Sequence, residues 1–227
     1  MSDQQNNEKK LAGQAAADLV QDGMLVGLGT GSTVNFFLHS LGNRVKKGLK
    51  IKGLPTSERT AALCHELGIE LTDFASVDKL DMAIDGADEI DGDFQMIKGG
   101  GGALLREKIV ASAADHVVIM VDGSKRVETL GQFPLPVEIV KFGHQQAERR
   151  VQELGIPYAM RLVDGEPYVT DNGNYILDCQ MDSIIAPAAM HDQLNSITGV
   201  VDNGLFIDLC HTLVVATGDK VEVLPKG

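Results

Sequence analysis

Hydrophobic residues in the first half of the chain alternate between two patterns. Short apolar runs, such as 24–28 and 117–121, are typical of strands that a sheet buries on both faces. Between such runs, apolar residues recur at helical spacing, most clearly over 34–41. Alternating strands and helices predict an α/β fold whose parallel sheet is covered by helices on both faces.

Glycine and capping residues set the predicted element boundaries. Gly23 and Gly42 each end a helix, and Thr56 or Ser57 is the candidate N-cap of another. The predicted helices are 8–22, 34–42, 104–113 and one that opens at 55–58. The predicted strands are 24–28, 49–54, 69–71, 80–84 and 117–121.

The pattern changes near Gly131, and the Phe-Pro-Leu-Pro segment 133–136 is typical of a linker. We expect a small α+β domain over 131–204, with a hairpin turn at 171–174. Its other predicted elements are strands at 137–140 and 158–162 and helices at 144–154 and 187–195. Strands predicted at 205–209, 212–216 and 220–224 return to the first domain, which then comprises 1–130 and 205–227.

The chain carries 32 acidic and 20 basic residues, for a net charge of −12, and aromatic residues make up 4% with no Trp. This composition argues against binding to nucleic acid or to an anionic membrane. The uncharged stretch 23–43 is interrupted by Gly, Ser and Thr, so it does not predict a transmembrane helix, and the polar start lacks a secretory signal pattern. We therefore expect a soluble, cytoplasmic protein.

Cysteine and histidine spacings indicate no metal or redox centre. Cys64, Cys179 and Cys210 form no close pair and are expected to stay reduced. The six histidines show no spacing typical of a metal site. We expect neither a metal nor another cofactor.

The first loop with candidate chemistry is the Gly-Thr-Gly-Ser-Thr segment 29–33, between a predicted strand and a predicted helix. Glycine permits close approach to the backbone, and a helix N-terminus offers N–H groups and partial positive charge to a phosphate. No lysine precedes Ser32 as in a P-loop, and the glycine spacing does not match the dinucleotide fingerprint. An ordinary turn with Ser32 as N-cap accounts for this loop equally well.

The second loop, 85–91, is rich in carboxylates and follows a predicted strand. Carboxylates at the carboxyl end of a parallel strand can bind hydroxyls or move protons. Taken alone, the segment is better explained as an acidic surface turn, because Asp-Gly is a common turn pair. The spacing of a calcium-binding loop is absent.

In the third loop Lys98 is followed by four glycines, 99–102, and then by a predicted helix that carries Glu107. Consecutive glycines lose much backbone entropy on folding, so they are expected where something must approach the backbone closely. A flexible linker is the alternative, which the buried neighbours disfavour. Lys125, after strand 117–121, is a weaker candidate for the same rim.

These loops together suit a small phosphorylated polyhydroxy compound. The chain shows no nucleotide motif, no metal-ligand set and no Ser–His or Cys–His arrangement. Chemistry carried by carboxylates and lysines alone points to proton transfer.

The motifs GTGST, DGADEID and KGGGGALLREK, in this order, resemble the A-type ribose-5-phosphate isomerase family. VDGSK, PLPVE and TGVVDNGLF extend the resemblance over essentially the whole chain. It implies a Rossmann-like, parallel-sheet domain with a smaller α+β domain, in a homodimer or homotetramer. It also implies metal-independent interconversion of ribose 5-phosphate and ribulose 5-phosphate through an enediolate, in the non-oxidative pentose phosphate pathway.

Position by position, the resemblance implies that Glu107 is the general base and that Asp85, Asp88 and Lys98 are its catalytic partners. It implies a further phosphate contact at Lys9, and Leu105 stands where some relatives carry Thr, with little expected effect. The substrate-binding residues that it implies are Thr30, Gly31, Ser32, Thr33, Asp85, Gly86, Ala87, Asp88, Lys98, Gly99, Gly100, Gly101 and Lys125.

The chemistry agrees with these roles, because one carboxylate can move a proton between adjacent carbons while Lys98 and loop N–H groups stabilise the enediolate. Asp85 and Asp88 are both candidates for opening the sugar ring.

Two other functions remain. A non-catalytic sugar-phosphate sensor is disfavoured by the intact residue set. A transferase with Glu107 as nucleophile would need an acyl-CoA pocket, for which the chain shows no separate motif.

Overall fold

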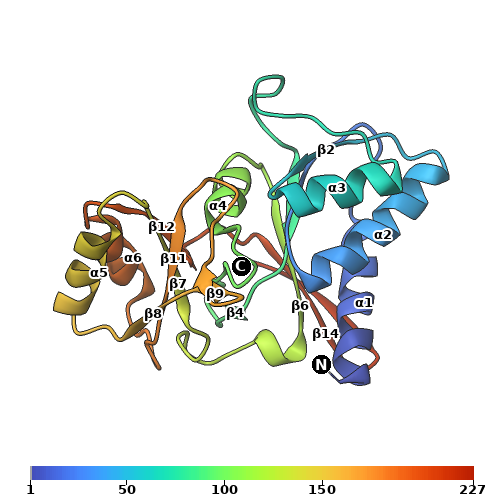
Figure 1. Ribbon diagram of the computed structural model, residues 1–227. Helices are drawn as coiled ribbons and strands as arrows, with labels where there is room; N and C mark the ends of the chain where they lie inside the picture. Colours follow the sequence, from blue (N-terminus) through green and yellow to red (C-terminus); the bar gives the residue numbers. More distant parts are fainter. Residues whose placement is uncertain (1) are drawn as a thin grey trace. The chain divides into compact units, whose positions relative to one another are not determined.

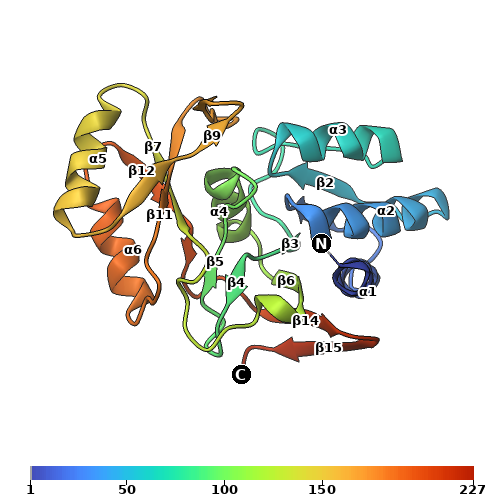
Figure 2. The same ribbon diagram turned by 60° about the horizontal axis from the view of Figure 1, so that its bottom comes forward.

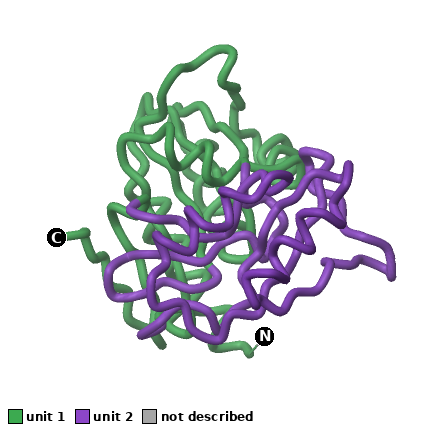
Figure 3. The backbone as a smooth tube through the Cα atoms, turned by 90° about the vertical axis from the view of Figure 1, so that its left-hand side faces the viewer, with its two compact units in different colours: residues 1–87, 106–126, 209–227 green, residues 88–105, 127–208 purple. Residues whose placement is uncertain are grey.

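The computed structural model describes residues 2–227 and forms two compact units (Figures 1 and 3). Unit 1 comprises Met1–Ala87, Arg106–Arg126 and Leu209–Gly227, and unit 2 comprises Asp88–Leu105 and Val127–Asp208. Residues 88–105, 127–130 and 205–208, expected in the first domain, group with unit 2. The reason is that the short strands in the first of these segments pair with Leu205–Phe206 rather than with the large sheet.

Unit 1 is built on a six-stranded sheet. Its order is β15 (Lys220–Pro225), β14 (Thr212–Thr217), β6 (Val117–Asp122), β3 (Met82–Asp85), β1 (Leu25–Leu28) and β2 (Lys52–Pro55). Every pairing is parallel except that of β15 with β14. The predicted α/β fold with a mainly parallel sheet is confirmed.

Four helices belong wholly or mostly to unit 1: α1 (Asp3–Asp18), α2 (Ser32–Lys46), α3 (Glu58–Leu67) and α4 (Leu104–Ser112). Val26 and Leu28 of β1 share one core with α1 and α2. Gly27 faces the other way, where a β-carbon would lie 2.4 Å from Val110 of α4. Helices therefore cover both faces of this sheet, as Figure 2 shows.

Several predicted boundaries in unit 1 are wrong. Helix α1 begins at Asp3, because Ser2 accepts a hydrogen bond from the Gln5 N–H, and it ends at Asp18 rather than at residue 22. Gly42 does not end α2, and a β-carbon there would lie 3.0 Å from Leu67 of α3, so glycine permits close helix packing. The predicted strand 69–71 is reduced to one bridge, between Leu71 and Gly53.

Unit 2 is α+β, as predicted. Its antiparallel sheet has the order β12 (Val200–Asn203), β7 (Leu135–Ile139), β11 (Tyr175–Cys179) and β8 (Tyr158–Met160). Its core includes side chains from α5 (His144–Glu153) and α6 (Pro187–Asn195). A smaller antiparallel sheet contains β13 (Leu205–Phe206), β5 (Met96–Ile97) and β4 (Glu89–Ile90).

Two predictions in unit 2 are wrong. The expected linker 133–136 enters the central strand β7, because Leu135 is fully buried in the core. The turn 171–174 forms, but β11 after it pairs with β7 and β8. The hairpin instead joins β9 (Leu162–Val163) and β10 (Glu166–Pro167) through Asp164 and Gly165, both at positive φ.

Over residues 2–227, no helix has the length and apolar character needed to cross a membrane.

Candidate active site

The loop between β1 and α2 forms a helix N-terminus without a side-chain cap. Gly31 is the N-cap at φ 140°, a value suited to glycine, and Ser32 is the first residue of the helix rather than its cap. The Lys9 ammonium lies 3.0 Å from Ser32 Oγ, although Lys9 is almost completely buried. This N-terminus thus combines backbone N–H groups, a hydroxyl and a positive charge, which suits an anion.

Thr30 holds the loop in place through a buried cluster of hydroxyl groups. Its Oγ1 lies 2.7 Å from Thr56 Oγ1, 2.8 Å from Ser57 Oγ and 3.1 Å from Thr60 Oγ1. Thr60 Oγ1 in turn donates to the carbonyl of Gly29. The Thr30 side chain therefore joins the loop to α3. The sequence had pointed to Thr56 and Ser57 only as helix caps.

Asp85, at the end of β3, lies directly beside this loop. It is 7% exposed, and its Oδ1 accepts hydrogen bonds from the N–H groups of Thr30 and Gly86 at 3.1 and 2.7 Å. Gly29 makes room for the carboxylate, since a β-carbon at Gly29 would lie 2.1 Å from Oδ1. The carboxyl ends of β1 and β3 thus bring two of the predicted loops together.

The remaining predicted residues of unit 1 lie on α4 and after β6. Glu107 belongs to the first turn of α4 and is 3% exposed, an uncommon position for a carboxylate. Lys125 is half-buried in the short 3₁₀ helix η1 (Gly123–Lys125) that follows β6. The side chain of Asp122 caps this helix by accepting the Ser124 N–H.

In unit 2, Asp88 and the glycine loop form a second group. Asp88 is half-buried, and its Oδ2 accepts the Gly100 N–H at 2.7 Å. Lys98 is 3% exposed, and its ammonium lies 5.2 Å from the centre of the Phe206 ring, a cation–π contact. Carboxylate, ammonium and glycine backbone therefore come from one continuous stretch of chain.

The glycine loop is closely packed, unlike a flexible linker. Gly99 and Gly102 have φ values of 106° and 81°. A β-carbon at Gly99 would lie 2.9 Å from Leu104, and one at Gly102 would lie 2.3 Å from the Tyr168 hydroxyl. Gly100 and Gly101 are exposed. Packing or backbone conformation therefore accounts for glycine at 99, 100 and 102.

Sequence reasoning missed two structural anchors of unit 2. Glu89, within the acidic motif, is 4% exposed and accepts the N–H groups of Gly131 and Phe133 at 2.7 and 2.6 Å. It therefore orders the backbone instead of facing a ligand. Arg161 contacts the glycine loop itself, and no local pattern in the sequence marks it.

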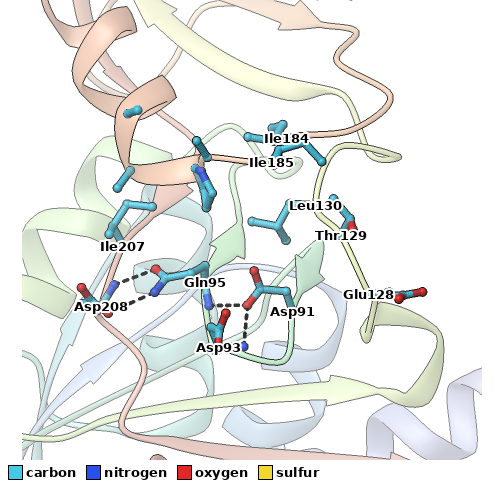
Figure 4. Close-up of a pocket in the computed structure, with 14 residues that line it drawn as sticks. Asp91, Asp93, Gln95, Glu128, Thr129, Leu130, Ile184, Ile185, Ile207 and Asp208 are labelled. Atoms are coloured by element: carbon cyan, nitrogen blue, oxygen red, sulfur yellow. Dashed lines mark hydrogen bonds between the residues drawn. The ribbon is translucent and has the colours of Figure 1, made fainter.

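Unit 2 also contains a cavity of about 640 Å³ that none of the predicted catalytic or substrate-binding residues lines, although Asp91 of the loop 85–91 does (Figure 4). The charged residues that line this cavity are all acidic: Asp91, Asp93, Glu128 and Asp208. Gln95 and Asp208 exchange two hydrogen bonds of 3.0 Å at its rim. Carboxylates repel a phosphate dianion, so this cavity is a poor candidate for a sugar-phosphate site.

The described cysteines are poorly suited to act as nucleophiles. All three cysteines are buried, and burial raises the pKa of each thiol to about 12. Within residues 2–227, no three His, Cys, Asp or Glu side chains gather as metal ligands would.

Fold and site residues define an α/β protein in which residues 30–33, Asp85 and Lys125 follow the carboxyl ends of parallel strands. Lys98 and Glu107 follow β5 of the small antiparallel sheet. The family model for ribose 5-phosphate isomerase A (phosphoriboisomerase A) matches residues 52–220. The chain belongs to this family.

Known relatives match over nearly the full chain. Ribose-5-phosphate isomerase A 1 of Oceanobacillus iheyensis is 50% identical over 97% of this chain and 99% of its own length. The solved ribose 5-phosphate isomerase of Plasmodium falciparum is 38% identical with a TM-score of 0.94, covering 97% of this chain and 99% of its own. A D-ribose-5-phosphate isomerase solved with phospho-erythronic acid is 36% identical, with a TM-score of 0.92 over 96% and 97% of the two chains.

Proposed function

We propose that this protein interconverts ribose 5-phosphate and ribulose 5-phosphate by moving one proton between C1 and C2 of the open-chain sugar. Membership of the family supports the reaction, and so does the relative that binds phospho-erythronic acid, a phosphorylated sugar acid. The observation that carries the proposal is the uncapped N-terminus of α2, where the buried Lys9 ammonium meets Ser32.

The substrate phosphate binds at residues 30–33 in this proposal. The N–H groups at the start of α2 and the Ser32 hydroxyl donate to its oxygens, and Lys9 supplies positive charge. Lys125 is assigned a further contact with the substrate. Binding energy from the phosphate holds the open chain in a reactive conformation at the other end of the sugar.

Glu107 is the general base, because it is a buried carboxylate in the first turn of a helix next to the glycine loop in sequence. It removes the C2 proton of the aldose and delivers a proton to the adjacent C1, and exchange of the carboxyl proton with solvent occurs between the two transfers. The C2 hydroxyl proton passes to O1, so that the carbonyl forms at C2. A positioned base of this kind contributes ~10²–10⁴-fold to the rate.

The intermediate is an enediolate, and its negative charge needs donors. The Lys98 ammonium and the N–H groups of 99–101 supply them, each donor contributing on the order of 3 kcal/mol. Asp85 and Asp88 move protons at the ring oxygen and the anomeric hydroxyl when the cyclic sugar opens. We further propose that the enzyme needs no metal, is a homodimer or homotetramer, and acts in the cytoplasm within the non-oxidative pentose phosphate pathway.

The test is formation of ribulose 5-phosphate from ribose 5-phosphate in the presence of EDTA, with Glu107→Gln as the variant. We expect metal-independent turnover in the wild type and a loss of ~10²-fold or more in the variant. Glu153→Gln is the matched control, because it makes the same change at an exposed carboxylate on α5. Turnover in D₂O should place deuterium in the product.

Each other outcome contradicts a stated part of the proposal. Near-normal turnover by Glu107→Gln would remove Glu107 as the base. Binding of ribose 5-phosphate without turnover by the wild type would indicate a sensor. A covalent adduct on Glu107, detected by mass spectrometry, would indicate a transferase.

A further inference from the structure

Arg161 lies between β8 and β9 and joins two parts of unit 2. Its Nε donates to Asp178 Oδ2 at 3.0 Å, and an Nη atom pairs with Asp178 Oδ1, so the guanidinium is held as a two-pronged pair on β11. Its other Nη donates to the carbonyl of Gly99 at 2.9 Å. The side chain is 14% exposed.

The peptide between Gly99 and Gly100 is held from both sides. Its carbonyl oxygen accepts from Arg161, and its N–H donates to Asp88 Oδ2 at 2.7 Å. The carbonyl and N–H of a trans peptide point in opposite directions, so Arg161 and Asp88 act on opposite edges of one planar group. Hydrogen bonds arranged in such a chain also polarise and strengthen one another.

This peptide needs support because glycines flank it on both sides. Rotating a peptide plane requires changes only in ψ of the residue before it and φ of the residue after it. Both residues here are glycines, which have no β-carbon to hinder these changes. A rotated plane would turn the Gly99 carbonyl toward the Asp88 carboxylate, where two oxygen atoms repel. Without Arg161, Asp88 would lose a donor and gain a repulsive neighbour.

We propose that Arg161, fixed by Asp178, is a positioning residue for the isomerase reaction, acting on Asp88 through the Gly99–Gly100 peptide. The proposal rests on the proposed function, in which Asp88 contacts the sugar. Arg161 itself touches no reacting atom in this scheme. Lysine is a poor substitute, because a single ammonium group cannot bind both carboxylate oxygens of Asp178 and also donate to the carbonyl of Gly99.

The experiment is a double-mutant cycle measured as kcat/KM for ribose 5-phosphate. We expect Arg161→Ala to lower kcat/KM by ~10–100-fold in the wild-type background, the loss typical of misplacing a catalytic group by about 1 Å. In the Asp88→Ala background the same change should cost less than about twofold, because the group it positions is absent. Asp178→Asn, which weakens the anchor, should give a smaller loss in the same direction.

The controls separate positioning from folding. Arg150→Ala removes an exposed arginine of the same unit that pairs with Glu153, and it should leave kcat/KM unchanged. Thermal unfolding of every variant reports stability, and Arg161→Lys replaces Arg161→Ala if the alanine variant does not fold. An equal fold-loss of kcat/KM from the Arg161 change in both backgrounds would overturn the proposal. A residue with only a general structural role would lower kcat/KM by the same factor whether or not Asp88 is present. A wild type inactive on ribose 5-phosphate would instead overturn the proposed function.

Discussion

Gly29→Ala adds one methyl group at the more crowded of the two glycines in the loop between β1 and α2. The new β-carbon would lie 2.1 Å from Oδ1, 2.2 Å from Cγ and 2.7 Å from Cβ of Asp85. Non-bonded heavy atoms pack best at ~3.5–4.0 Å, so the whole carboxyl group has to move by about 1 Å or more. The φ angle of Gly29 is not positive, so the effect comes from this overlap rather than from backbone strain.

The displacement has a cost in stability and a larger cost in activity. Moving Asp85 breaks the hydrogen bonds from the N–H groups of Thr30 and Gly86, and overpacking of this kind costs ~1–3 kcal/mol. At ~2–4 °C per kcal/mol for a chain of this size, the melting temperature should fall by several degrees. In the proposed mechanism Asp85 moves a proton of the substrate, so a displacement of about 1 Å should lower kcat/KM by ~10²-fold.

The assay compares Gly29→Ala with Gly92→Ala, in thermal unfolding and in turnover of ribose 5-phosphate. Gly92 is the matched control, because a β-carbon there meets nothing within 4 Å and its φ is not positive. Wild-type kcat/KM in a well-folded Gly29→Ala variant would contradict this prediction. It would mean either that Asp85 tolerates displacement or that it takes no part in the reaction.

Two further predictions concern unit 1. Ser32→Ala should raise KM for ribose 5-phosphate by ~10-fold or more and leave kcat nearly unchanged, because it removes one hydrogen bond to a charged group. Steady-state kinetics measure both constants. An unchanged KM would mean that the substrate phosphate does not bind at Ser32. The pKa of His116 is lowered by burial and by the neighbouring His211. As pH falls below 6.5, His116 therefore binds a proton more readily in the unfolded chain than in the folded protein, and protonation favours unfolding. The free energy of unfolding of the wild type should therefore fall relative to that of His116→Gln between pH 7.5 and pH 5.5. Urea unfolding at both pH values measures the difference, and a constant difference would show that His116 does not titrate in this way.

The sequence was informative wherever local pattern decides structure. Strands β1 and β6 and helices α4, α5 and α6 lie close to their predicted positions, because each is a continuous apolar run or a helical repeat with clear ends. Long-range packing decided the errors. The local pattern predicts a helix end at Gly42, but Gly42 lies inside α2 beside Leu67. The same pattern predicts a linker at 133–136, but this segment enters a strand because Leu135 fills the core.

The candidate site shows the same division between local and long-range information. Residues with intrinsic chemistry, such as Glu107 and Lys98, could be singled out from residue type and neighbouring glycines. Residues that hold them could not, because their partners are distant in sequence. Thr60 contacts Gly29 across 31 positions, and Arg161 contacts Gly99 across 62. An isolated threonine or arginine carries no sign of such a partner in a single sequence.

Two glycine–aspartate pairs explain why the motifs depend on one another. In unit 1, Gly29 leaves space for the Asp85 carboxylate, and the next N–H along the chain, from Thr30, donates to it. In unit 2, a β-carbon at Gly100 would lie 2.8 Å from Asp88 Oδ1, and the Gly100 N–H donates to that carboxylate. In both units an aspartate occupies the space a side chain would need and is held by the backbone that the glycine exposes. Alanine at either glycine would therefore displace the aspartate, so these glycines determine where the Asp85 and Asp88 carboxylates lie as well as the conformation of their own loops.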